Sequence, residues 1–360
     1  MTRRRKLGLA AAAIAIGAVL FLNSGNTWLA QRAFYRALDT SVGVDQSAAL
    51  GDGLHAYVCG SGSPMPDATR AGPCIGVLAG NQAFVFDAGS GSIRKLMRMG
   101  FPMEKIQAGF LTHLHSDHID GLGELLLQAW IGGSRGVPLP VYGPEGTDKV
   151  IAAESALYEI DKGFRIAHHG EAVARPGGFG GTAQVIALPE GADAQVAYDR
   201  DGVRITVIRV VHDPVKPAFG YRVDYKGRSI TISGDTAYSP VLARAARGSD
   251  LLLHEALNRK MVAALGAQLE KRGRSDAARI MHDIQGYHAS PEEAARTARE
   301  AGVRALVLYH LVPAPPAKLI EPLFLGDAPK EFSGTLRLAQ DGMMISLPAG
   351  GQDVKISNVF

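Results

Sequence analysis

Three histidines and one aspartate stand within residues 112–118, which read T-H-L-H-S-D-H. The spacing H-x-H-x-D-H lets His113 and His115 face one metal ion. Asp117 and His118, after the chain turns, can then face a second. Imidazole and carboxylate groups suit Zn²⁺ and similar borderline ions. A polar surface loop that happens to be rich in histidine is the alternative, but four well-spaced ligands in one segment favour a metal centre.

Four ligands cannot fill two metal sites, so other parts of the chain must supply more. Polar residues that end three β-type segments are the candidates: His212 after residues 203–211, Asp235 after 229–233 and His310 after 305–309. Sheets of α/β proteins place their sites just past the carboxyl ends of strands. Taken singly, each residue has another explanation: a hydrogen-bonded core histidine, a helix N-cap or turn aspartate, and a loop histidine.

The elements that must position these residues are strand-like runs in two sets, with helical stretches between them. The strand-like runs are 55–59, 75–79, 83–86, 109–112 and 139–142, then 196–198, 203–211, 220–225, 229–233, 251–254, 305–309 and 343–347. The helical stretches are 92–99, 122–130, 147–157, 240–246, 258–271 and 291–301. Two β-sheets with helices outside, a four-layer αββα sandwich of the α/β class, accommodate this pattern.

The order of these motifs resembles that of the metallo-β-lactamase superfamily. The resemblance is strongest to the branch that holds ribonuclease Z and the arylsulfatase-like and phosphodiesterase-like hydrolases. Further matching segments are Gly60–Pro64, Phe86–Gly89, Phe219–Arg222, Ser233–Thr236, Leu253–Ala256 and His288–Ser290. The resemblance covers residues 54–348 and implies the metallo-β-lactamase fold.

The resemblance also implies which residues bind metal. His113, His115 and His212 would hold the first zinc ion, while Asp117, His118 and His310 would hold the second, with Asp235 bridging both. Such paired ions lie about 3.5–4 Å apart and share a hydroxide. That hydroxide forms near neutral pH because zinc lowers the pKa of bound water to about 7. Asp117 could in addition orient it.

The resemblance further implies that His288 donates a proton to the leaving group. Such a donor is needed because hydrolysis of a phosphodiester or sulfate ester expels an alkoxide or phenoxide. Glu255 and His254 are candidates to orient His288, although a structural role suits His254 better. A plain histidine before a helix is the alternative for His288. Ser290, with Pro291 after it and Glu293 three residues on, predicts a capping box.

Departures from ribonuclease Z shape the prediction of the substrate. The stretch 151–181 is short for an arm that clamps tRNA, and is either a remnant arm, a lid or a surface loop. Residues 311–316 replace the Ser-Arg-Tyr that follows the last histidine in many tRNA-processing relatives. The sequence therefore predicts a small-molecule phosphodiesterase or arylsulfatase. The alternatives are a lactonase or β-lactam hydrolase that uses Tyr287 or Tyr309, a tRNA 3′-end endonuclease, and a non-catalytic scaffold.

Charge leads to the same prediction. The chain has 38 Lys and Arg against 35 Asp and Glu, a net charge of +3, and four of the positive charges lie in residues 3–6. A tRNA-binding protein normally shows a basic face over its domain. The composition therefore argues against nucleic acid as a partner.

The N-terminus predicts an exported or anchored enzyme. Residues 3–6 are basic and 7–22 are apolar, which is typical of a signal-anchor over residues 1–23, with a cleaved signal peptide as the alternative. We therefore expect a membrane-anchored enzyme on the extracytoplasmic face, or a secreted one. Residues 24–52 are expected to form an amphipathic helix and a linker, 53–350 the hydrolase domain and 351–360 a tail.

Two features are left open by the sequence. Cys59 and Cys74 are the only cysteines, and either a disulfide or two buried apolar side chains would explain them. Relatives in this branch are often dimers, so the resemblance also allows a homodimer.

Overall fold

The computed structural model describes residues 26–40 and 42–360, so the predicted anchor at residues 1–23 lies outside the described residues. The chain divides into two compact units, Met1–Gln46 and Ser47–Phe360. In the first unit, residues 26–40 form a helix with exposed aromatic side chains that include Trp28 and Phe34. Within the described ranges, no helix combines the length and the apolar character that crossing a membrane requires.

Two sheets form the second unit. The eight-stranded sheet has the order β15 (Lys355–Asn358), β14 (Met343–Pro348), β1 (Gly53–Gly60), β2 (Cys74–Ala79), β3 (Gln82–Phe86), β4 (Ile106–Phe110), β5 (Leu139–Gly143), β6 (Gly181–Val185). The seven-stranded sheet has the order β13 (Thr335–Leu338), β12 (Ala305–Val312), β11 (Leu251–Leu257), β10 (Arg228–Ile232), β9 (Phe219–Tyr225), β8 (Val203–Arg209), β7 (Ala194–Arg200).

Helices cover the outer faces of the two sheets. The α-helices are α2 (Ser92–Arg98), α3 (Ser116–Ile119), α4 (Leu122–Ile131), α5 (Thr147–Leu157), α6 (Glu159–His169), α7 (Pro240–Ala245), α8 (Arg259–Lys271), α9 (Ser275–Asp283), α10 (Pro291–Ala301), α11 (Glu321–Leu325) and α12 (Ala328–Glu331). Short 3-10 turns are η1 (Gln46–Leu50), η2 (Met103–Lys105), η3 (Pro176–Gly178), η4 (Ile284–Gly286) and η5 (Lys318–Ile320).

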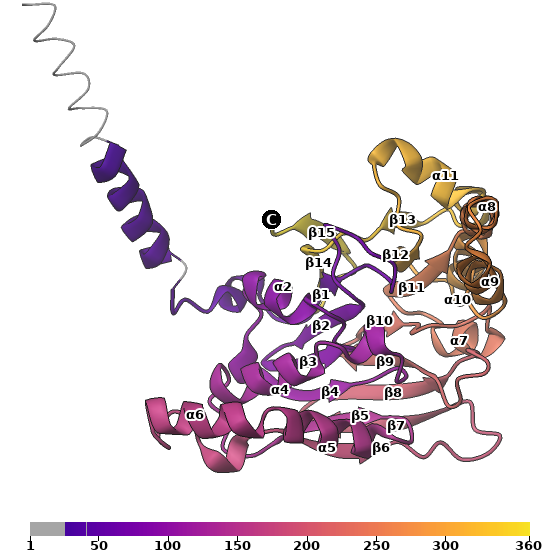
Figure 1. Ribbon diagram of the computed structural model, residues 1–360. Coiled ribbons are helices and arrows are strands. Elements are labelled where there is room, and N and C mark those ends of the chain that lie inside the picture. Colours follow the sequence, from indigo (N-terminus) through magenta and orange to yellow (C-terminus); the bar gives the residue numbers. More distant parts are fainter. Residues whose placement is uncertain (1–25, 41) are drawn as a thin grey trace, which may run out of the picture. The chain divides into compact units, whose positions relative to one another are not determined.

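Three apolar clusters show how these layers pack. The central cluster joins inward-facing residues of both sheets, such as Phe84 and Phe110 with Tyr221. A second lies between the eight-stranded sheet and α2, α4 and α5, and a third lies between β11, β12 and α10. Figure 1 shows the two helical groups on opposite sides of the sheets. This is the predicted αββα sandwich.

Local sequence explains the strand and the helix next to the site. β12 is buried along its whole length, as expected for a parallel strand with neighbours on both edges, and its sequence is almost entirely apolar. At the start of α10, the Ser290 hydroxyl accepts from Glu293 N–H, and the Glu293 side chain accepts from Ser290 N–H. Gly302, at φ 63°, ends the helix. The structure therefore contains the predicted capping box.

The structure adds detail at four places: a strand within the predicted tail at 351–360, two helices and a disulfide. Residues 355–358 pair with β14 as strand β15, because an unpaired edge of β14 is available to them. The stretch 151–181 holds helix α6 rather than a plain loop, and α9 was not anticipated. Cys59 and Cys74 form a disulfide that joins the end of β1 to the start of β2.

Candidate metal centre

The H-x-H-x-D-H segment lies at the carboxyl end of β4. The chain stays extended to His115 and then turns into the short helix α3, which carries Asp117 and His118. His113 and His118 are fully buried. Thr112 ties this loop to the other sheet, because its carbonyl accepts from Phe219 N–H at the start of β9. Both sheets therefore fix the loop in place.

Asp87, directly after β3, holds two of these histidines in orientation. Its carboxylate accepts from the Thr112 backbone N–H at 2.8 Å and from the Thr112 hydroxyl at 2.9 Å. It also lies 2.8 Å from His118 Nδ1. Because a carboxylate only accepts, Nδ1 of His118 carries the hydrogen and Nε2 is left free. The Thr112 hydroxyl oxygen, 3.0 Å from His113 Nδ1, can in the same way leave Nε2 of His113 free.

The second sheet supplies the other candidate ligands. His212 follows β8 and Asp235 follows β10. His310 lies inside β12, where the pairing with β11 slips by one residue between Glu255 and Ala256. His310 has a φ of 46°, a conformation rare for a residue with a side chain. This bulge directs the side chain out of the strand pattern and towards the site.

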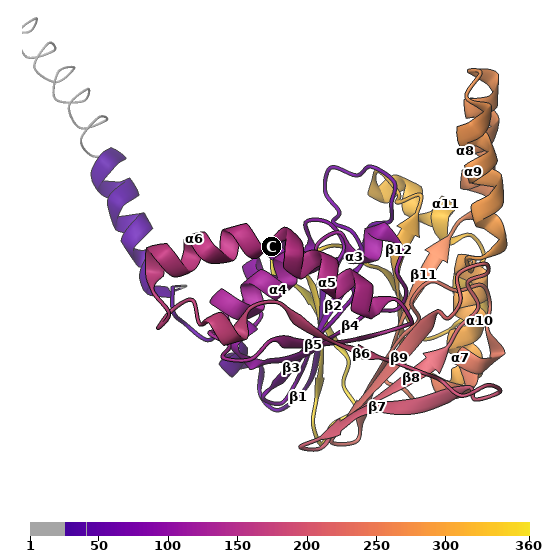
Figure 2. The ribbon, with the colours of Figure 1, turned by 60° about the horizontal axis from the view of Figure 1, so that its bottom comes forward.

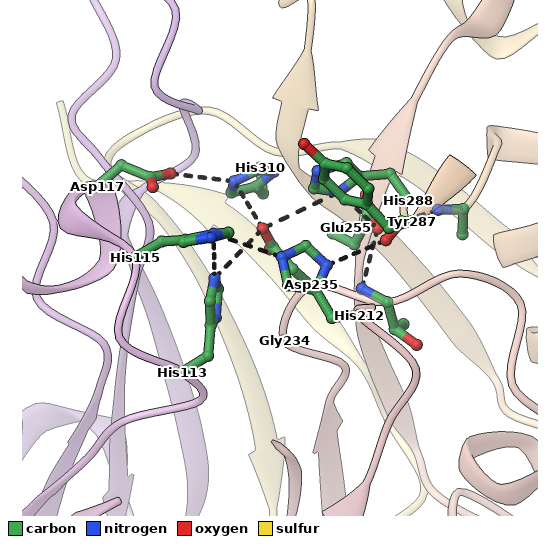
Figure 3. A network of polar contacts seen from close by, with 12 residues as sticks. His113, His115, Asp117, His212, Gly234, Asp235, Glu255, Tyr287, His288 and His310 are labelled. Atoms are coloured by element: carbon green, nitrogen blue, oxygen red, sulfur yellow. Dashed lines mark hydrogen bonds and ion pairs between the residues drawn. The ribbon is translucent and has the colours of Figure 1, made fainter. Parts of the chain in front are cut away.

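His113, His115 and His212 form the first group. His113 Nε2 lies 2.9 Å from His115 Nδ1, and His212 Nε2 lies 3.4 Å from the same atom (Figure 3). His212 Nδ1 faces the carbonyl oxygen of Tyr287 at 3.1 Å and so carries the hydrogen. Three imidazole nitrogens therefore converge on one point, where together they could bind one ion.

Asp117, His118 and His310 form the second group, and Asp235 stands between the two groups. His310 Nε2 lies 3.3 Å from Asp117 Oδ2 and 3.3 Å from Asp235 Oδ2. Asp235 Oδ2 also lies 3.4 Å from His118 Nε2 and 3.9 Å from His113 Nε2. A single carboxylate oxygen therefore faces both groups, as a bridging ligand would.

The electrostatics of the buried atoms fit a cation. Among the described residues, His118 Nε2 and Asp235 Oδ1 are buried without a hydrogen-bond partner. Burial lowers the pKa of His113 well below its ordinary value, which keeps that ring in the neutral form that binds metals. Burial also lowers the pKa of His118, but Asp235 and Asp87 outweigh it and raise that pKa well above the ordinary value. The surroundings of His118 therefore favour a positive charge, such as that of a metal cation.

His288 stands beside the two groups and is paired with a carboxylate. His288 Nδ1 lies 3.1 Å from Glu255 Oε1 and 4.0 Å from Asp235 Oδ2. Glu255 is fully buried, and its Oε1 also accepts from the Ala289 and Thr236 backbone N–H groups. Burial lowers the pKa of His288, but the carboxylates of Glu255 and Asp235 raise it to about 9. This ring can therefore carry a proton at neutral pH.

All eight residues that the sequence analysis selected come together at this site. Glu255 also lies where it was expected, against His288, while His254 is buried with its Nδ1 on the Glu255 carbonyl oxygen at 2.7 Å. The orienting role of Asp87 was not anticipated. The Phe86–Gly89 motif contains this aspartate, but nothing in its local sequence indicates that it contacts His118.

Comparison with known proteins identifies the family. The family described as β-lactamase superfamily domain matches residues 82–311. A ribonuclease Z from Mycobacterium avium (strain 104) is 38% identical over 290 residues, which are 80% of this chain and 96% of that protein. A ribonuclease Z from Mycobacterium sp. (strain KMS) is 40% identical over 261 residues, covering 72% of this chain and 85% of that protein.

Solved structures agree on the fold. The metallo-β-lactamase fold protein YhfI from Bacillus subtilis has a TM-score of 0.59 at 20% identity, covering 82% of this chain and 100% of that one. The short form of human tRNase Z has a TM-score of 0.55 at 24% identity, covering 82% of this chain and 99% of that one. At these identities the likeness shows the fold alone.

These relatives correct three predictions. A small-molecule phosphodiesterase or arylsulfatase is wrong as the main function, because the matched relatives, which the chain covers almost whole, are ribonucleases Z. The exclusion of nucleic acid is wrong for the same reason: the net charge is a sum over the chain and does not describe any one surface. The membrane-anchored or secreted location rested on the N-terminal residues alone and is wrong on the same finding.

The fold prediction and the family resemblance are confirmed by the same comparisons, and the His and Asp groups of the site supply the donor set that a metal-dependent hydrolase requires. The chain belongs to the metallo-β-lactamase superfamily, in the branch of hydrolases that includes ribonuclease Z.

Proposed function

We propose that this chain is an endonuclease of the ribonuclease Z type, which hydrolyses a phosphodiester bond at the 3′ end of precursor tRNA. The observation that carries the proposal is the 38% identity to a ribonuclease Z over 96% of that relative's length. The arrangement of His, Asp and Glu side chains described above supports the same chemistry.

The donor set suits two zinc ions. His113, His115 and His212 would hold one ion, Asp117, His118 and His310 the other, and Asp235 would bridge them. Neutral imidazoles and carboxylates are the ligands that zinc prefers when thiolates are absent. When bound, such a pair lowers the pKa of a water molecule and offsets charge that develops on the phosphoryl oxygens.

The protein itself contributes the proton that the leaving oxygen needs. Glu255 accepts from Nδ1 of His288, which leaves the Nε2 side of the ring to face the substrate. The backbone N–H groups of Ala289 and Thr236 hold the Glu255 carboxylate in place. A protonated His288 can therefore donate to the departing ribose oxygen, and Glu255 is the residue that positions it.

A cleft beside β6 and β8 borders the site. Its volume is about 700 Å³, and His212 lies in its wall together with apolar residues such as Leu188 and Val211. Lys216 adds a positive charge to the same wall. The cleft therefore borders the candidate metal centre at His212 and offers room for a substrate beside it.

The test is cleavage of a precursor tRNA that carries a 3′ trailer, with mature tRNA as the control substrate. We expect one cut near the end of the tRNA body, loss of activity after treatment with a chelator, and recovery on addition of Zn²⁺. Elemental analysis of the same sample should give about two metal ions per chain. A sample that holds metal and hydrolyses bis-p-nitrophenyl phosphate, yet leaves the precursor intact, would refute the proposal.

A further inference from the structure

Helices α8 and α9 form a hairpin that stands away from the sheets. α8 packs chiefly on α9, and α9 packs in addition on η4. Figure 2 shows the two helices side by side, with their joined end beyond the rest of the second unit. No residue of α9 is buried, and Val262 is the only buried residue of α8. Most of the hairpin surface is therefore available to a partner.

The base of the hairpin is fixed to the candidate active site. Asn258 caps α8 through Met261 N–H and donates to the Phe324 carbonyl oxygen. Arg259 donates through Nη2 to the His288 carbonyl oxygen at 3.1 Å and to Glu293 Oε2 at 2.8 Å. A movement of the hairpin would therefore be transmitted to the backbone of His288, the residue proposed as the proton donor.

The far end of the hairpin carries three exposed cations, Lys271, Arg272 and Arg274, which we call the hairpin tip. None of the three forms an ion pair or a side-chain hydrogen bond with another described residue. Residues 259–283 hold six Lys and Arg against three Asp and Glu, a net charge of +3, which equals that of the whole chain. The hairpin therefore carries a local excess of positive charge, separate from that of the basic residues 3–6.

We propose that the α8–α9 hairpin binds RNA through backbone phosphates at its tip. The proposal rests on the proposed function and adds a place where the substrate is held. A helix of the length of α8 spans about 20 Å. The tip would therefore contact nucleotides well away from the scissile bond, while the base stays against His288.

The surface chemistry favours RNA over a lipid bilayer. Residues 270–276 contain no large apolar side chain, and the exposed Leu265 and Ile280 lie further towards the base. Membrane-surface helices insert apolar side chains beside their cations. Glu270 and Asp276 are also exposed in residues 270–276, so this segment has a net charge of +1. Phosphate binding by Lys and Arg requires exposed positive charge, which the three cations of the tip offer.

The test replaces all three tip cations with alanine, as K271A/R272A/R274A. Binding would be measured by fluorescence anisotropy at several salt concentrations, using precursor tRNA with a non-hydrolysable phosphonate at the scissile position. We expect about tenfold weaker binding at low salt, and a slope of log K against log salt shallower by up to about three. Metal content and hydrolysis of bis-p-nitrophenyl phosphate should not change.

The control is R200A/R204A/K226A, which removes the same number of positive charges near the β7–β8 and β9–β10 turns, where Arg204 pairs with Asp199 and Lys226 with Asp52. It should keep wild-type binding and slope. Wild-type binding by the tip variant, in a protein that cleaves the precursor, would overturn the hairpin proposal alone. Failure of the wild type to cleave the precursor would overturn the proposed function instead. Loss of binding to anionic phospholipid vesicles but not to RNA would also overturn the hairpin proposal.

Discussion

The candidate metal centre and the α8–α9 hairpin meet at His288, yet they are built in opposite ways. At the centre, His113, His118 and Asp235 are at most 2% exposed, and strands of both sheets fix them. At the hairpin tip, every residue from 270 to 276 is exposed, and only a pair of helices supports it. The function of the metal centre therefore depends on the exact placement of its side chains, whereas that of the hairpin tip depends on its positive charge.

This difference teaches how each region should respond to change. A buried group that is held by several neighbours cannot move to replace a lost partner, so one substitution there affects the whole centre. Exposed cations act at a distance and independently, so their effects are small, additive and sensitive to salt. Substitutions at the metal centre should therefore have larger effects than substitutions at the hairpin tip.

The largest effect is expected for Asp235→Asn. The substitution keeps the shape of the side chain but removes the negative charge that faces both groups of histidines. We expect metal content to fall by about half or more, and cleavage of precursor tRNA to fall by about 10³-fold or more. Elemental analysis and single-turnover cleavage would measure the two effects.

Asp120→Asn is the control, because Asp120 ends the same short helix as Asp117 but lies outside every group of candidate ligands. Full metal content and near-normal activity in Asp235→Asn would show that the two groups do not share a ligand. The metal centre would then tolerate substitution as well as the hairpin tip does, and the expected difference between the two regions would be refuted.

The second effect concerns the pairing of His288 with Glu255. His288→Ala should slow precursor cleavage by about 10²–10⁴-fold, the range of general acid catalysis, without loss of metal. Hydrolysis of bis-p-nitrophenyl phosphate should slow far less, because p-nitrophenolate leaves without a proton. Rates measured in parallel on the two substrates would show how much more the variant slows precursor cleavage than bis-p-nitrophenyl phosphate hydrolysis.

His282→Ala serves as the matched control, since His282 lies on α9 with its side chain 88% exposed. The rate of precursor cleavage by Glu255→Gln should lie between those of His288→Ala and His282→Ala. This variant should also slow the precursor more than bis-p-nitrophenyl phosphate, as expected for a residue that acts through His288. Equal slowing of both substrates by His288→Ala would assign that residue to the structure of the centre rather than to proton transfer.

The sequence could predict the candidate ligands because the residue types and spacing that indicate them are local. His113, His115, Asp117 and His118 lie in one segment, so their spacing alone indicates a metal site. His212, Asp235 and His310 were predicted because each ends a recognisable strand. The bulge that aims His310 could not be predicted, since the slip arises from pairing between β11 and β12 over more than 50 residues of separation.

Other parts depend on contacts that no local pattern encodes. An aspartate after a strand, such as Asp87, has the pattern of a turn residue, and its bond to His118 spans 31 positions. Helix α9 has only nine residues and buries none of them, so it depends on packing against α8. The net charge was misleading because it adds the basic hairpin and the basic residues 3–6 to a remainder that holds 28 Lys and Arg against 32 Asp and Glu.

A third, smaller effect is expected for Asp87→Asn. Asp87 has a φ of 56°, a conformation that asparagine also tolerates, so the backbone should be preserved. The amide can still accept from Thr112 but holds His118 Nδ1 less strongly, and we expect metal affinity to fall about 10–100-fold. Competition with a chelator would measure it. Asp201→Asn, at a φ of 48° in the β7–β8 turn, is the matched control. An unchanged affinity would mean that packing alone orients His118.

The smallest effect is expected for a single change at the tip, Arg272→Ala. One exposed cation that touches one phosphate contributes roughly one to the salt slope of binding. We therefore expect affinity for precursor tRNA to fall only about two- to threefold at moderate salt, with the slope shallower by about one and no change in cleavage of bound substrate. Anisotropy at several salt concentrations would resolve the slope even where the affinities nearly overlap. A loss as large as that of the triple variant would mean that Arg272 sits in a specific, geometrically fixed contact, and that the hairpin tip resembles the centre more than its exposure indicates.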